Sequence, residues 1–129
     1  MSRLVVHKSV KDELIDKLVD LSKSLKVGPG YEVDTGLTPI ISEKQLEKVE
    51  GYARSGVQQG AEAVHGGTRA DREGYLLEAT VLNNVKQDTS VARDDIFGPV
   101  LLVLEYEDQD AAINISNDTT FVLDSDVFE

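Results

Sequence analysis

Five consecutive apolar residues at positions 100–104, Val-Leu-Leu-Val-Leu, follow directly on a Gly-Pro pair. A short run of this kind is typical of a strand that is buried on both faces, as the inner strands of a parallel sheet are. The run therefore indicates an α/β fold, in which helices cover both faces of the sheet.

The spacing of apolar residues elsewhere predicts three helices, near residues 10–26, 43–59 and 108–117. Ser9, Ser42 and Asp108 are the expected N-caps of these helices. Asp12 and Gln45 would complete capping boxes in the first two. The expected buried faces consist of Val10, Leu14, Leu18, Leu21 and Leu25 in the first helix, and of Leu46, Val49, Ala53 and Val57 in the second.

Extended segments separate these helices. Strands are expected at residues 3–7, 61–64, 75–82, 100–104 and 122–128, with a short helical turn at 88–95. The connection at 27–41 is longer than usual, so we expect it to be packed or functional. Together these segments predict a three-layer α/β unit with a mostly parallel sheet, forming one domain over residues 1–129. The chain opens on one predicted strand and closes on another, which is compatible with a natural domain and also with a piece cut from a larger domain.

Composition excludes several classes of function. The chain has 24 acidic and 13 basic residues and a net charge of -11, which argues against nucleic acid as a partner. It contains no cysteine, so disulfides, thiolate zinc sites and cysteine catalysis are excluded within this chain. No apolar run approaches the ~20 residues of a membrane span, and no signal-peptide pattern is present. We therefore expect no membrane association and a cytoplasmic location.

The spread of acidic residues along the chain has two interpretations, which composition leaves open. One is an ordinary acidic, soluble cytoplasmic protein. The other is a halophilic protein of a high-salt cytoplasm, in which salt screens the repulsion between dense surface carboxylates.

Few residues suggest chemistry. His7 and His65 stand at predicted strand ends without carboxylates at metal-ligand spacing, so no metal site is expected. No nucleophile elbow or glycine-rich phosphate loop is present. The segment D-D-I-F-G-P-V at 94–100 differs, because it places two acids and a Phe directly before the buried strand. A hydrophobic plug followed by a turn is the simpler interpretation. The other is a site in which a carboxylate binds a sugar diol and an aromatic ring packs on a flat ring.

This segment resembles the E-E-I-F-G-P-V motif of the NAD(P)-dependent aldehyde dehydrogenases. Four further segments are similar to that family in the same order: S-R-L-V-V-H at 2–7, P-I-I-S at 39–42, G-Y-L-L-E-A-T-V-L at 74–82 and N-D-T-T-F-V-L at 117–123. The resemblance covers essentially the whole chain. It implies part of the catalytic domain, from just after the catalytic-cysteine loop to beyond the E-E-I-F-G-P-V motif.

The resemblance implies two cofactor-binding residues. In the family, the second acid of the motif accepts hydrogen bonds from the nicotinamide ribose, and the aromatic residue two positions later contacts the nicotinamide region. Asp95 and Phe97 fall at these positions. Asp95 is one methylene shorter than the usual Glu. The chain also departs from the family at Thr38, Ala79 and Val122, where Gly, Pro and Gly are usual. At Val122, a β-branched residue would be strained if the site requires a positive φ.

The resemblance further implies NAD or NADP as cofactor and oxidation of an aldehyde as the family reaction. The family's nucleophilic cysteine, general-base Glu and Rossmann-type cofactor domain have no counterpart in this chain, so no catalytic residue is assigned and the chain alone is expected to be inactive. The alternative is a non-catalytic remnant or a partner-binding module. In either case we expect self-association, or association with the missing parts of the enzyme, through uncovered sheet edges and apolar faces.

Overall fold

The apolar run at 100–104 lies at the centre of the sheet. In the computed structural model, which describes residues 3–121 and 124–128, this run belongs to β4 (Val100–Tyr106). β4 pairs in parallel with β1 (Arg3–His7) on one side and with β3 (Thr80–Asn83) on the other. β2 (Glu62–His65) pairs antiparallel with β3, which gives the order β1-β4-β3-β2. The prediction of a mostly parallel sheet is confirmed.

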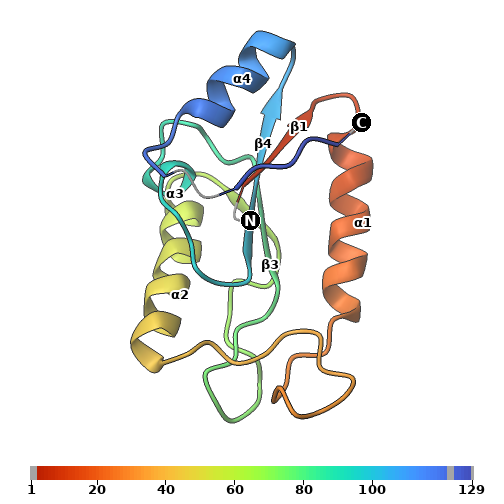
Figure 1. Ribbon diagram of the computed structural model, residues 1–129, viewed down its shortest axis with the longest axis vertical. Coiled ribbons are helices and arrows are strands. Elements are labelled where there is room, and N and C mark those ends of the chain that lie inside the picture. The colour runs from red at the N-terminus through yellow and green to blue at the C-terminus, as the bar shows by residue number, and fades with distance from the viewer. Residues whose placement is uncertain (1–2, 122–123, 129) are drawn as a thin grey trace.

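Helices cover both faces of this sheet (Figure 1). α1 (Lys11–Ser24) lies on one face, and α2 (Glu43–Gln58) lies on the other with the short α3 (Ser90–Arg93). α4 (Gln109–Asn117) follows β4 and packs against β4 and β1. The predicted three-layer α/β architecture is confirmed.

Side chains of β4 alternate between two apolar clusters, as the period of a strand requires. Leu102 and Leu104 belong to the cluster that contains Leu46 and Val49 of α2. Val103, between them, belongs to the cluster that contains Ile15 of α1. All three β4 residues are almost fully buried. The apolar run is therefore explained by burial on both faces.

The beginning of α1 differs from the prediction. Its N-cap is Val10, without a side-chain cap, and Ser9 does not act as one. The Ser9 hydroxyl instead lies 2.7 Å from Nδ1 of His7, within the turn that links β1 to the helix. A hydroxyl that bonds locally in this turn is not available to the helix N–H groups.

The buried face of α1 is also rotated from the expected one. Ile15, which the pattern left out, is buried, whereas Val10 and Leu21 are 50% and 58% exposed. Each residue turns a helix by about 100°, so a sheet contact centred on Ile15 moves both ends of the expected stripe toward solvent.

In α2 the expected stripe is correct at Leu46, Val49 and Ala53 and wrong at Val57, which is 47% exposed. Gly56 takes the place of Val57. A Cβ atom at Gly56 would lie 2.8 Å from Cδ1 of Leu82, so the missing side chain lets this turn of α2 approach β3 closely.

The remaining caps and connections follow the sequence more closely. Ser42 accepts a hydrogen bond from the Gln45 backbone N–H at 3.2 Å, and Asp108 accepts one from Ala111 at 2.8 Å, so both predicted N-caps are confirmed. The helical turn expected at 88–95 corresponds to α3. The segment expected to be extended at 75–82 forms a strand only from Thr80 onward.

The prediction of a strand at 122–128 is wrong for residues 124–128, which are the part of this segment that the structure describes. Val122 and Leu123 lie outside the described residues, and the strain expected at Val122 falls there with them. Residues 124–128 are exposed and have no regular secondary structure. A strand requires a neighbour for its backbone groups, and these residues do not lie in a ladder.

Ion pairs order the long connection between α1 and α2. Lys26 lies 2.9 Å from Glu32 and 2.8 Å from Asp34, and Arg72 lies 2.9 Å from Glu32. Hydrogen bonds from Lys26 and Arg72 lower the pKa of the Glu32 carboxyl. The connection is therefore packed, as expected, and it is tied to the loop that carries Arg72.

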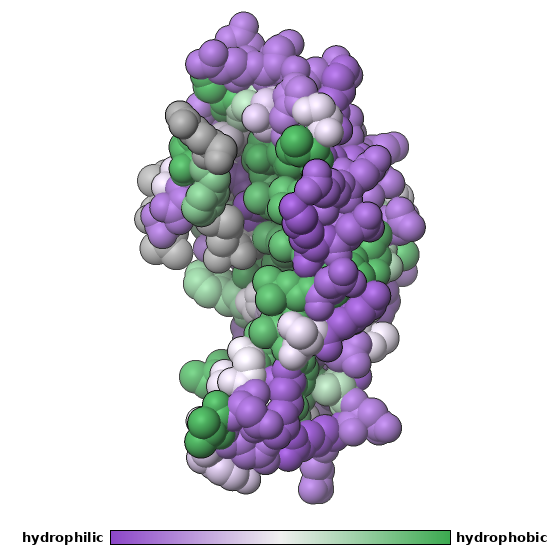
Figure 2. Space-filling model, turned by 90° about the vertical axis from the view of Figure 1, so that its right-hand side faces the viewer, coloured by the Kyte–Doolittle hydropathy of each residue, from purple (hydrophilic) through white to green (hydrophobic). Residues whose placement is uncertain are grey.

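The face on which α1 lies is largely hydrophilic, with an apolar band running between the hydrophilic regions (Figure 2). Within the described part of the chain, no helix is long and apolar enough to span a membrane.

Candidate functional site

The D-D-I-F-G-P-V segment forms the loop between α3 and β4, which runs along α2 to the start of β4 (Figure 1). Ile96 is 5% exposed and belongs to the cluster on the α2 face. Its neighbours Asp95 and Phe97 are half-buried and 65% exposed, respectively. The buried Ile96 thus anchors a loop that presents a carboxylate and an aromatic ring at the surface.

The Gly-Pro pair fixes the end of this loop. A Cβ atom at Gly98 would lie 2.6 Å from Cγ1 of Val49, so only glycine permits this approach to α2. The Pro99 carbonyl accepts a hydrogen bond from the Thr80 N–H at 2.8 Å, which joins the loop to the first residue of β3. The simpler interpretation of the motif is therefore confirmed, because Ile96 is a hydrophobic plug before a turn. The turn leaves Phe97 at the surface, and the binding of a sugar diol and a flat ring stays a prediction.

A cavity of about 490 Å³ lies beside Phe97. One wall comes from the long connection between α1 and α2, and the other comes from the Gly-Pro turn. Its size is within the usual range for small-molecule sites, which are mostly apolar with a few polar groups. The lining residues are Gly36, Leu37, Thr38, Ile40, Ile41, Gln45, Phe97, Gly98 and Pro99.

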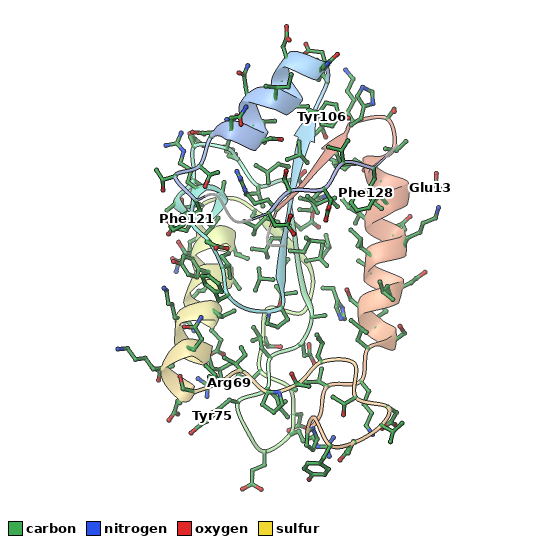
Figure 3. All side chains as sticks on the ribbon, in the orientation of Figure 1. Glu13, Arg69, Tyr75, Tyr106, Phe121 and Phe128 are labelled. Carbon is green, nitrogen blue, oxygen red and sulfur yellow. The ribbon has the colours of Figure 1, made fainter. Side chains whose placement is uncertain are left out.

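A hydrogen bond ties this connection to the loop that carries Tyr75, and an ion pair ties that loop to α2. The Ile40 N–H donates to the Tyr75 carbonyl at 2.8 Å. Arg69, near Tyr75 at one end of α2 in Figure 3, forms a 2.8 Å ion pair with Glu50 of α2. The long connection thus forms one side of the cavity, and a functional role for it stays a prediction.

Asp95 does not line this cavity. It lies beyond Ile96, on the side of the loop near Tyr52 of α2. Burial raises the pKa of the Tyr52 hydroxyl, and the negative charges of Asp94 and Asp95 raise it further. The structure therefore brings Asp95 and Phe97 onto one loop, but on opposite sides of the buried Ile96.

Two residues near the motif were not predicted as part of the site. The sequence indicates a capping role for Gln45, and its position after the P-I-I-S segment is similar to the family, yet neither predicts that its side-chain Nε2 donates to the Phe97 carbonyl at 3.1 Å. Tyr52 was not singled out at all. Gln45 and Tyr52 are seven residues apart, about two turns of α2, which places them on one face, but this signal is indistinguishable from ordinary core spacing.

The His7 ring is held by contacts with its neighbours. Nδ1 of His7 contacts Ser9, and Nε2 lies 3.1 Å from the Glu107 carbonyl oxygen. The His7 ring also packs edge-on against Tyr106 at 5.3 Å. Over residues 3–121 and 124–128, no three His, Asp or Glu side chains are grouped so as to hold a metal ion.

The α/β unit thus presents a carboxylate and an aromatic ring on one loop, with an apolar cavity beside the aromatic ring. Comparison with known proteins identifies a specific family. The model of the aldehyde dehydrogenase family matches residues 1–129. The chain belongs to this family.

The sequence relatives agree. The chain is 38% identical over 122 residues to a mitochondrial aldehyde dehydrogenase of Leishmania tarentolae. This match covers 95% of this chain and 24% of that protein. It is 38% identical over 128 residues to a probable betaine aldehyde dehydrogenase of Schizosaccharomyces pombe, covering 98% of this chain and 26% of that protein. The chain thus spans about a quarter of the length of the relatives it matches.

Solved structures match in fold as well. An aldehyde dehydrogenase of Bacillus cereus in complex with NAD+ superimposes with a TM-score of 0.88 at 34% identity, covering 92% of this chain and 24% of that one. A betaine aldehyde dehydrogenase of Staphylococcus aureus, also in complex with NAD+, gives a TM-score of 0.88 at 34% identity, with the same coverage. The fold is therefore that of part of an aldehyde dehydrogenase catalytic domain.

Proposed function

We propose that this chain forms the part of an aldehyde dehydrogenase catalytic domain that receives the nicotinamide end of NAD+ or NADP+. Asp95 accepts hydrogen bonds from the ribose hydroxyls, and Phe97 packs beside the nicotinamide ring. The supporting observation is the loop itself, in which the buried Ile96 anchors a carboxylate and an exposed aromatic side chain on either side.

The chemistry of these residues fits the cofactor. An ionised carboxylate accepts two hydrogen bonds from a vicinal diol, and hydrogen bonds to a charged acceptor are stronger than neutral ones. Leu37, Ile40 and Phe97 give the cavity apolar surface on which a flat ring can pack. When bound, the cofactor accepts the hydride from the substrate. This chain binds and orients it.

The family reaction requires a thiolate nucleophile, which attacks the aldehyde before the hydride is transferred. This chain contains no cysteine. The proposed role is therefore cofactor positioning, and aldehyde oxidation requires residues that this chain does not contain.

The role of Asp95 is tested by two substitutions. Asp95→Asn keeps the shape of the side chain and removes its charge. NAD+ should then bind more weakly by about tenfold or more, because a hydrogen bond to a charged group contributes about 1.5 to 3 kcal/mol. Asp95→Glu adds the methylene that Asp95 lacks, so NAD+ should bind more tightly than to the unchanged chain. The measurement is an NAD+ titration of the isotope-labelled chain, followed through its amide resonances.

Asp94→Asn is the matched control, because it makes the same change in net charge at the neighbouring carboxylate. Its effect on NAD+ affinity should be small. Equal losses in Asp94→Asn and Asp95→Asn would show that only bulk charge matters, and the assignment of Asp95 would then be wrong.

Self-association of the chain, expected from its sequence, stays a prediction.

A further inference from the structure

A second cavity lies at the edge of the sheet opposite to the proposed cofactor loop. The D-D-I-F-G-P-V segment enters the sheet at the start of β4, which is the amino edge of the parallel strands (Figure 1). In open α/β sheets, ligands usually bind outside the carboxyl ends of the strands, where the connections from two adjacent strands turn to opposite faces. The proposed function gives the carboxyl edge of this sheet no role.

The strands β1 and β4 meet this condition at their carboxyl ends. They are adjacent and parallel. The chain that leaves β1 turns to α1, whose Ile15 packs in the apolar cluster on one face of the sheet. The chain that leaves β4 turns to α4, whose Ile115 packs in the cluster of α2 on the other face. The topology therefore predicts a ligand beside the carboxyl ends of these strands.

A cavity of about 260 Å³ lies at this edge. Its volume equals that of about nine water molecules in the liquid. The walls come from the first residue of α1, from the end of β3 and the turn after it, and from β4. The lining residues are Lys11, Asn83, Asn84, Val85, Val103 and Glu105. Three elements that are far apart in the sequence thus meet around one small space.

A left-handed residue brings three consecutive side chains to this cavity. Asn84 has a φ of 55°, a conformation that Asn adopts more readily than most residues. Along a continuing strand, successive side chains would point to opposite faces of the sheet. The turn at Asn84 instead allows Asn83, Asn84 and Val85 all to line the cavity.

The charges around the cavity favour a neutral ligand. Nζ of Lys11 pairs with the Glu105 carboxylate and lies 3.4 Å from Oδ1 of Asn84. The hydrogen bond from Lys11 lowers the pKa of Glu105, so this carboxylate is ionised at neutral pH. The Lys11 ammonium therefore already occupies the place of a cation, and the Glu105 carboxylate repels an anion.

The polar groups of the cavity favour a ligand that donates hydrogen bonds. An ionised carboxylate has two acceptor oxygens, and Lys11 supplies only one of the donors that Glu105 can accept. Oδ1 of Asn83 is buried and has no hydrogen-bond partner among residues 3–121 and 124–128. A buried acceptor without a partner is costly, so a donor from a ligand would be favourable there. Val85 and Val103, both buried, add an apolar wall for a carbon skeleton.

We propose that this cavity binds a small neutral polyol through two adjacent hydroxyl groups, which donate to Glu105 and Asn83, while Lys11 donates to one of the hydroxyl oxygens. An ammonium has three N–H donors, so Lys11 can keep its bonds to Glu105 and Asn84 and still provide the third. The site lies apart from the Asp95–Phe97 loop, so this inference does not depend on the proposed function.

The first test varies the ligand. The isotope-labelled chain is titrated with glycerol and, separately, with 1,3-propanediol, which has the same carbon chain but no adjacent hydroxyls. Glycerol should shift the amide resonances of Lys11, Asn84 and Glu105 along a curve that saturates. 1,3-Propanediol should bind about two- to tenfold more weakly, the range that one net hydrogen bond provides. The resonances of Phe97 and Gly98 should stay in place with both ligands.

The second test varies the site. Glu105→Gln keeps the shape of the side chain and removes its charge, so glycerol should bind about tenfold more weakly, because hydrogen bonds to charged groups are the stronger ones. Glu107→Gln is the matched control. Glu107 is the next acidic residue after Glu105, its side chain is 69% exposed, and it pairs with Lys8 outside the cavity. Its substitution should leave glycerol affinity unchanged.

Three results would overturn the inference. One is equal binding of the two diols, and another is equal glycerol affinity of Glu105→Gln and Glu107→Gln. The third is a set of shifts that increases linearly with glycerol over the whole chain, because such shifts report a change of solvent and not a site. If glycerol shifts Asp95 and Phe97 and leaves Lys11 and Glu105 in place, the polyol binds at the cofactor loop, and the assignment to this cavity is wrong.

Discussion

Mixed with an aldehyde and NAD+ or NADP+, this chain is expected to form no reduced nicotinamide above the protein-free control. Enzymes typically accelerate their reactions by about a millionfold or more, and here that acceleration depends on a thiolate nucleophile. The chain contains no cysteine. The assay follows absorbance at the reduced-nicotinamide band with several aldehydes at high protein concentration.

Cofactor binding by this chain is also expected to be weak. One hydrogen-bonding carboxylate contributes about 1.5 to 3 kcal/mol, whereas micromolar affinity requires about 8 kcal/mol. Turnover that exceeds the control and survives a second purification would contradict this account. It would require a nucleophile other than a cysteine within these 129 residues.

The largest effect on stability is expected for Gly66→Ala. Gly66 has a φ of +68°, and a Cβ atom added there would lie 2.1 Å from the carbonyl oxygen of Ala79. Left-handed backbone costs an L-residue about 1 to 2 kcal/mol, and overpacking adds about 1 to 3 kcal/mol. The substitution should therefore lower the free energy of unfolding by about 3 kcal/mol, measured by denaturant unfolding.

Gly60→Ala is the matched control. Gly60 also has a positive φ, +100°, but an added Cβ atom would meet nothing within 4 Å. It should carry only the cost of the backbone conformation, about 1 to 2 kcal/mol. If the two substitutions destabilise the chain equally, the close approach of Gly66 to the start of β3 is not a source of strain.

Much of the fold could be predicted from local pattern because burial and capping leave clear local signals. The apolar run of β4 reflects burial against α1 and α2 at once. Ser42 and Asp108 cap their helices through hydrogen bonds that span three residues. Such signals lie within a few positions of one another in the sequence.

The error at Ser9 is local, because its hydroxyl contacts His7 two residues earlier and does not cap the helix. The other errors arise where distant parts of the chain decide the outcome. α1 is rotated so that Ile15 faces the sheet. Gly56 replaces Val57 on the buried face because Leu82 of β3 leaves no room for a side chain. Each case depends on a contact that the spacing of apolar residues does not record.

The candidate site divides in the same way. The motif that contains Asp95 and Phe97 is continuous in sequence, so its resemblance to the family could be seen directly. The cavity beside Phe97 is built from the connection around Leu37 and from Gln45, both more than 50 residues earlier in the chain. Only the folded structure brings these parts together.

The proposed contact of Asp95 and Phe97 with the nicotinamide half of the cofactor can be measured by titrating the isotope-labelled chain separately with nicotinamide mononucleotide and with adenosine monophosphate, the two halves of NAD+. Nicotinamide mononucleotide should shift the amide resonances of Asp95, Phe97 and Gly98, and adenosine monophosphate at the same concentration should leave them in place. Equal shifts from both halves, or shifts from adenosine monophosphate alone, would contradict the proposed contact.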